Sequence, residues 1–127
     1  MADEAAVERA RRYASLRDMP PGGRADRETD LRVADLAGAD LSGLDLERAN
    51  LYAAKLAGAN LREARLVKAQ LREANLEGAD LTGADLRGAN LIGANLQNAI
   101  LTGAHVKAAL FDGADVEGAT LPDEMRD

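Results

Sequence analysis

One feature constrains this chain more than any other, a large aliphatic or aromatic residue that recurs every five residues without a break in register. Two residues before it stands alanine, except in the two repeats that carry Thr29 and Leu44 there. The unit reads Ala-(Asp/Asn)-Leu-x-Gly, as in residues 79–83 and 89–93. The central slot is filled by Leu31, Leu36, Leu41, Leu46, Leu51, Leu56, Leu61, Leu66, Leu71, Leu76, Leu81, Leu86, Leu91, Leu96, Leu101, Val106, Phe111, Val116 and Leu121.

A period of five residues fits neither a long helix nor a straight strand. On a helix, successive leucines would lie about 140° apart and spread around the axis. On a strand, they would point alternately to opposite faces of the sheet. The pattern therefore predicts a solenoid, in which the chain turns the same way after every repeat and all the leucines point to one axis. The glycines that close many of the units suit turns with a positive φ.

The repeat resembles that of the pentapeptide-repeat family. The resemblance covers nineteen repeats, residues 29–123, and implies an all-β fold, a right-handed quadrilateral β-helix in which four repeats form one square coil. In that fold the leucine and alanine slots point inward, so the nineteen central residues form the structural core. The other three positions of each repeat are expected to face solvent.

A capping helix is predicted before the repeats but not after them. Residues 1–28 are expected to form an N-terminal capping helix and a connector, with the helix running from Asp3, its N-cap, to Asp18. Its narrow apolar stripe suits a cap over the first coil, although an amphipathic helix that binds a partner is the alternative. Residues 124–127 form a C-terminal tail that is predicted to be too short for a capping helix.

The composition argues against catalysis and against ligand sites. The chain has no cysteine and one histidine, His105, in an outward slot, which does not make a transition-metal site. Aspartate and asparagine interchange before the leucine, which indicates a hydrogen-bonding role in which charge is optional. We therefore expect a non-enzyme with no catalytic, cofactor-binding or metal residues. With no signal-like or membrane-spanning run we expect a cytoplasmic protein. The scarcity of aromatic residues argues against direct nucleic-acid binding.

Every fourth repeat lies on the same side of the predicted prism, so the sequence sorts the charges by face. One side is predicted to be basic, with Arg48, Arg65, Lys68, Arg87 and Lys107 against Asp45, Glu47 and Asp85. We expect a rigid scaffold that binds an unidentified protein partner. The alternative, implied by the resemblance, is a DNA mimic that binds DNA gyrase, as quinolone-resistance members do. The net charge of -6 favours that alternative, whereas a belt formed by Lys55, Arg62, Arg65, Lys68 and Arg72 argues against it.

The C-terminal end of the solenoid is predicted to leave an open β-edge. Ile92 and Leu110 are outward apolar residues on one face in adjacent coils, and Phe111 follows in a central slot. These three residues form the candidate interface. We expect a homodimer through the C-terminal end, because a bare edge beside apolar side chains favours pairing. The alternative is a monomer whose last residues fold over the edge.

Overall fold

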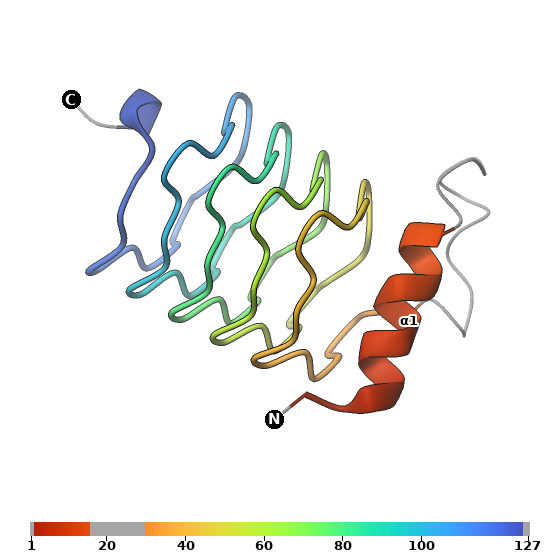
Figure 1. Ribbon diagram of the computed structural model, residues 1–127. Coiled ribbons are helices and arrows are strands. Elements are labelled where there is room, and N and C mark those ends of the chain that lie inside the picture. The colour runs from red at the N-terminus through yellow and green to blue at the C-terminus, as the bar shows by residue number, and fades with distance from the viewer. Residues whose placement is uncertain (1, 16–29, 126–127) are drawn as a thin grey trace.

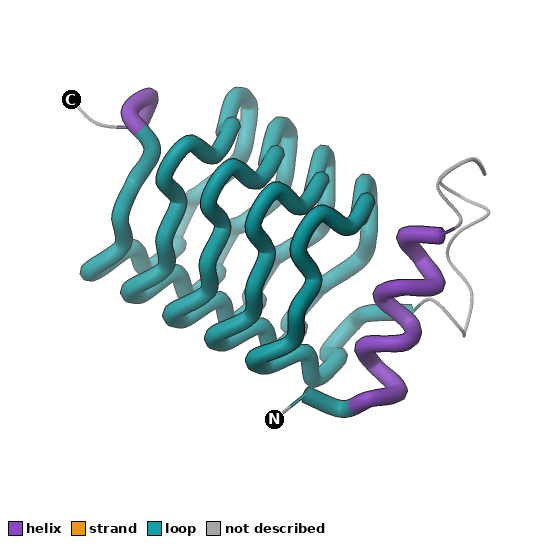
Figure 2. Tube along the Cα trace, viewed as in Figure 1, coloured by secondary structure: helices purple, strands orange, loops and turns teal. Residues whose placement is uncertain are grey.

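The computed structural model describes residues 2–15 and 30–125. Within these ranges the regular elements are the helix α1, Glu4–Ser15, and the short 3-10 helix η2, Asp123–Met125. The chain between them consists of turns and isolated bridges, and no continuous strand occurs in the described ranges (Figure 2). The connector that was predicted up to residue 28, residues 16–18 of the predicted helix, Thr29 and the last two residues lie outside the described part.

The repeats wind into stacked coils that run from α1 to the C-terminal end (Figure 1). Parallel bridges join residues that are 20 positions apart, from Asp35 with Lys55 to Ile100 with Thr120. At a typical bridge the Leu36 amide donates to the Lys55 carbonyl (2.7 Å), and the Lys55 amide donates back to the Ala34 carbonyl (2.8 Å). Each coil is therefore hydrogen-bonded to its neighbours at one bridged pair of residues in each repeat and at each corner, where for example the Gly38 amide donates to the Ala57 carbonyl (2.9 Å), rather than through continuous strands.

A tight turn forms each corner of the coil. In the first turn the Ala34 amide donates to the Leu31 carbonyl (3.2 Å), and the same bond recurs along the solenoid. The residue before the alanine, or before Leu44 in one turn, has a positive φ in all eighteen described turns, ten of which have glycine there. The other eight are Val33, Arg48, Ala53, Glu63, Lys68, Glu73, Asn98 and Ala108. The glycine slot thus has a conformational requirement that other residues also meet.

The core is a column of leucine and alanine side chains. Every central leucine from Leu31 to Leu101 is at most 1% exposed. Val106 is 8% exposed, whereas Phe111, Val116 and Leu121 are only half-buried. These last three residues differ from the expected closed core because no further coil covers them among the described residues.

The helix α1 covers the first coil and supplies hydrogen bonds that a preceding coil would otherwise make. Asp3 caps the helix by accepting a bond from the Ala5 amide (3.0 Å). The Asp3 amide donates to the Asp35 carbonyl (2.9 Å), just as the Leu36 amide does to Lys55 one coil later. The buried Tyr13 donates its hydroxyl proton to the Glu47 carbonyl. The buried residues Ala6, Ala10 and Tyr13 lie on the side of the helix that faces the coil.

The C-terminal end is partly closed by a short helix, which corrects the prediction that the tail is too short for a capping helix and agrees with the alternative in which the last residues fold over the edge. The helix η2 follows the buried Pro122, and the Glu124 carboxylate accepts a hydrogen bond from the Val106 amide (2.7 Å). The carboxylate takes the place of the carbonyl that a further coil would provide. Other amides of the last coil have no acceptor within the described residues, namely those of Ala108, Phe111, Gly113, Val116 and Gly118.

Candidate functional site

Most outward aspartates and asparagines have a structural task. The side-chain oxygen of the residue before the central slot accepts a hydrogen bond from the amide two residues later, as Asn90 does from Ile92 (3.1 Å). The same Asx turn occurs at Asp30, Asp35, Asp40, Asp45, Asn50, Asn60, Asn75, Asp80, Asp85, Asn95 and Asp115. An amide and a carboxylate oxygen accept this bond equally well, which explains why the two residue types interchange.

Among the described residues, the carboxyls whose pKa departs clearly from the ordinary value are all shifted downward. The bond from the Arg32 side chain lowers the pKa of Asp30 to about 2. The Ser42 hydroxyl and amide lower the pKa of Asp40, and the Arg87 guanidinium lowers the pKa of Asp85. Such shifts keep these carboxylates charged, whereas a general acid at neutral pH needs a raised pKa.

The single histidine, His105, belongs to no group of metal-binding side chains within the described residues. His105 is exposed, and its backbone is paired with the coil below through the Ala84 carbonyl (2.9 Å). Residues 2–15 and 30–125 contain no group of three or more histidine, cysteine or acidic residues placed to hold a metal ion. Because the column of leucines fills the interior, the chemistry available to partners lies on the outer surface.

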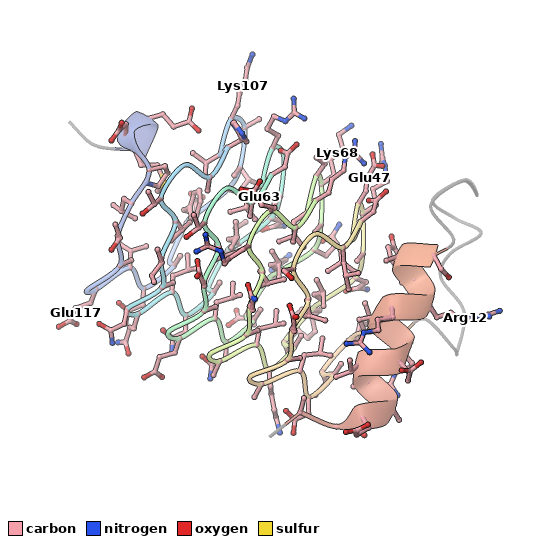
Figure 3. The ribbon with its side chains drawn as sticks, in the orientation of Figure 1. Arg12, Glu47, Glu63, Lys68, Lys107 and Glu117 are labelled. Atoms are coloured by element: carbon pink, nitrogen blue, oxygen red, sulfur yellow. The ribbon has the colours of Figure 1, made fainter. Side chains whose placement is uncertain are left out.

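The basic face is the outer surface of the repeats centred on Leu46, Leu66, Leu86 and Val106. Its three carboxylates are engaged by two arginines: Arg65 pairs with Glu47 (2.6 Å) and Asp45 (3.6 Å), and Arg87 pairs with Asp85 (2.6 Å). Arg48, Lys68 and Lys107 are exposed and have no ion pair within the described part of the chain. Figure 3 shows Lys68 and Lys107 projecting from the same long edge of the solenoid. The basic face therefore presents cations that its own carboxylates do not neutralise.

The apolar residues of the predicted interface lie in neighbouring coils on one face. Leu110 is 47% exposed and is bridged to Asn90, two residues before Ile92. Ile92 and Phe111 are both half-buried.

A second apolar pair, which is not part of the predicted interface, lies at the other end of the same face. Val33 is 59% exposed and donates its amide proton to the carbonyl of Tyr52 (2.8 Å), which is 46% exposed. The one signal in the sequence that could have identified Val33 as exposed is its position in the repeat, which faces outward at a turn.

A family model for pentapeptide repeats matches residues 27–51, 49–88 and 89–123. The chain belongs to the pentapeptide-repeat family. Membership implies the quadrilateral β-helix, so the predicted fold is confirmed at that level. The family's proteins are generally non-catalytic.

Solved structures of other family members resemble this chain over most of the solenoid. A pentapeptide-repeat protein from the thylakoid lumen of Arabidopsis thaliana is 34% identical with a TM-score of 0.68, and the match covers 80% of this chain and 66% of that one. A pentapeptide-repeat protein from Nostoc PCC 7120 is 36% identical with a TM-score of 0.62, over 68% of this chain and 76% of that one. The plasmid-mediated fluoroquinolone resistance protein QnrB1 is more distant, at 16% identity and a TM-score of 0.41.

No curated protein matches the sequence significantly. Within the described ranges, α1 is the longest helix, and no helix has the length and apolar character needed to cross a membrane.

Proposed function

We propose that this pentapeptide-repeat protein is a rigid, non-catalytic scaffold that binds a protein partner through its outer surface. The observation that carries the proposal is that each position of the repeat has a different role. The inward leucines and alanines form the core, most outward aspartates and asparagines form Asx turns, and the remaining outward residues vary from repeat to repeat. The nineteen repeats of residues 29–123 then serve as one right-handed frame that holds these variable side chains at a spacing of about 4.8 Å for each coil.

The basic face is the surface that we assign to the partner. Arg48, Lys68 and Lys107 are exposed cations without an ion pair in the described part of the chain, while the protein as a whole has a net charge of -6. An acidic protein surface would be attracted to this face and repelled by the rest of the solenoid, which fixes the orientation of binding. Membership of a generally non-catalytic family and a cytoplasmic location, proposed from composition, are compatible with this role.

An affinity pull-down from the source cell tests the proposal. We expect the wild-type protein to retain a partner and the double variant Lys68→Glu/Lys107→Glu to lose it. The matched control is Lys55→Glu/Arg72→Glu, which makes the same change in net charge on other faces and should retain the partner. Loss of the partner with both variants would reject the basic face, and a wild-type protein that retains no partner would reject the scaffold role.

The alternative function is DNA mimicry directed at DNA gyrase. The net negative charge and the rod shape support it, whereas the belt with Lys55, Arg62 and Arg72 opposes it because a mimic of the DNA backbone should stay negative. The likeness to QnrB1 carries no weight at its low identity. A gyrase supercoiling assay with and without the protein separates the two functions. We expect supercoiling to be unchanged, and inhibition or protection from a quinolone would favour the alternative.

The proposed self-association uses the C-terminal end. Support comes from the amides of the last coil that lack acceptors and from the half-buried Phe111, Val116 and Leu121. Head-to-tail stacking is blocked because α1 covers the other end, so a two-fold contact between C-terminal ends closes the assembly. Light scattering should detect a dimer that Ile92→Glu/Leu110→Glu abolishes. Val33→Glu/Tyr52→Glu, on the same face at the other end, should leave it intact. A wild-type protein that stays monomeric at high concentration would end this proposal.

A further inference from the structure

The chain contains one aspartate that is followed directly by glycine, and it lies in the last coil of the solenoid. Asp112 and Gly113 occupy the two exposed corner positions of the repeat centred on Phe111. In contrast, the aspartates and asparagines of the Asx turns all precede a leucine or valine. The bulk of those residues hinders attack by their backbone nitrogen on the preceding side chain. Glycine has no side chain and leaves its nitrogen accessible.

The hydrogen bonding of the Gly113 nitrogen also differs from that of its counterparts in the inner coils. One coil earlier, the Gly93 amide donates to the Asp112 carbonyl (2.9 Å), and two coils earlier the Glu73 amide donates to the Ile92 carbonyl (3.1 Å). The Gly113 amide has no acceptor among the described residues, because no coil follows it there. Rotation of this peptide unit toward the Asp112 side chain therefore breaks one bond, from the Gly93 amide to the Asp112 carbonyl, whereas rotation of the corresponding unit at Gly93 breaks a second bond as well, made by the glycine amide itself.

We infer that Asp112–Gly113 is a site of spontaneous succinimide formation and aspartate isomerisation. The Gly113 backbone nitrogen forms a bond to Cγ of Asp112. A side-chain oxygen leaves as water, taking up the amide proton and the carboxyl proton. Water then adds to one of the two carbonyls of the ring. Addition at Cγ restores aspartate, and addition at the backbone carbonyl yields isoaspartate, in which the chain runs through the side-chain carboxyl.

Isomerisation would loosen the end of the solenoid. The isoaspartyl linkage adds one methylene to the main chain. It also turns the Asp112 backbone carbonyl, which accepts the bond from the Gly93 amide in the unmodified protein, into a free carboxylate. Within the described residues the last coil is held by such backbone bonds to one neighbouring coil only, including the Leu110 amide to the Ala89 carbonyl (2.9 Å) and the Asp115 amide to the Ala94 carbonyl (3.0 Å). The product is the chemical group that protein isoaspartyl carboxyl methyltransferases accept, so these enzymes are the class of partner that would act here.

The test compares the same dipeptide in the last coil and one coil inward. Ile92→Asp places an aspartate before Gly93, in the same slot of the same face, where the glycine amide is hydrogen-bonded to Asp112. Purified proteins are incubated at neutral pH and physiological temperature, and isoaspartate is located by peptide mapping and by enzymatic methylation. Dilute protein is used, since the end-to-end contact proposed above would cover this coil. A second inward variant, Ala57→Asp, places aspartate before Gly58, whose amide donates to Glu77 (2.8 Å).

We expect isoaspartate to accumulate at Asp112 at least about tenfold faster than at residue 92 or 57, because the inner sites react only after local opening. In urea the three sites should react at similar rates, and Asp112→Glu should remove the wild-type signal. Circular dichroism identifies any variant that does not fold, in which case the other inward variant supplies the comparison. Equal rates in the folded state, or the same ratio of rates in urea, would overturn the inference.

Discussion

The glycine slot offers the sharpest test of how this solenoid turns its corners. Gly58 has a φ of +67°, and a Cβ added there would meet no atom within 4 Å. Substitution at this position therefore changes the backbone preference without creating a clash. It differs from Gly83, where a Cβ would collide with the side chain of Glu63. Gly58→Ala thus measures conformational strain alone, and Gly58→Val adds the effect of a β-branched side chain.

The expected magnitude follows from two opposing terms. Holding an L-residue in the left-handed region costs roughly 1–2 kcal/mol. Replacing glycine also restricts the unfolded chain, which offsets about 0.4–1 kcal/mol of that cost. Gly58→Ala should therefore destabilise the protein by about 1 kcal/mol, and the β-branched Gly58→Val by about 2 kcal/mol.

Urea unfolding followed by circular dichroism measures both variants. The matched control is Ala57→Val, at the preceding position, which is not among the residues with a positive φ and should tolerate a β-branched side chain. A coincident transition by a second probe is needed, because repeat proteins can lose two-state behaviour. The reasoning is refuted if Gly58→Ala is as stable as the wild type, or if Ala57→Val loses as much stability as Gly58→Val.

The remaining predictions concern the core, the cap and acid stability. Leu76→Lys should lose at least about 2 kcal/mol of stability from burial and also leave an unpaired charge among the leucines. Thr82→Lys should cost under about 1 kcal/mol, because it loses one hydrogen bond to Asp80. Similar melting temperatures of the two variants would contradict the assignment of inward and outward positions. Tyr13→Phe should cost about 1 kcal/mol by removing the hydroxyl bond to Glu47, and the exposed Tyr52→Phe should cost nothing measurable in the same thermal melts. Asp30 has a folded pKa of about 2, below the unfolded value of about 3.9, so its contribution is present above pH 4 and is lost as the pH falls toward 2. Acid titration of Asp30→Asn should show a weaker loss of stability over that window, and an unchanged acid profile would count against the Arg32 contact.

Much of the solenoid could be predicted because its information is local and repeated. The five-residue period excludes regular helix and strand, and the interchange of aspartate with asparagine indicated a hydrogen-bonding slot, which the structure contains as Asx turns. Asp3 and the apolar stripe of the N-terminal segment predict the helix α1 that covers the first coil. The proposed basic face also follows from counting every fourth repeat. Only the three-dimensional structure shows that Arg65 and Arg87 pair with the carboxylates of this face and that Lys68 and Lys107 have no ion pair within the described residues.

The five-residue register alone determined that the chain must coil, which side chains form the column and which remain outside. Only the tertiary structure decided how the ends are completed and which corners are strained. The Tyr13 hydroxyl donates to the Glu47 carbonyl, and the Glu124 carboxylate accepts from the Val106 amide, across 34 and 18 residues of sequence. Tyr13 and Glu124 lie outside the five-residue repeat, so the repeat could not predict these contacts. Likewise, Val33 and Lys68 adopt the left-handed conformation that their residue types disfavour, because closing the coil requires it at every corner. Local sequence sets the repeat, whereas the ends and corners are governed by backbone groups that must find partners in space.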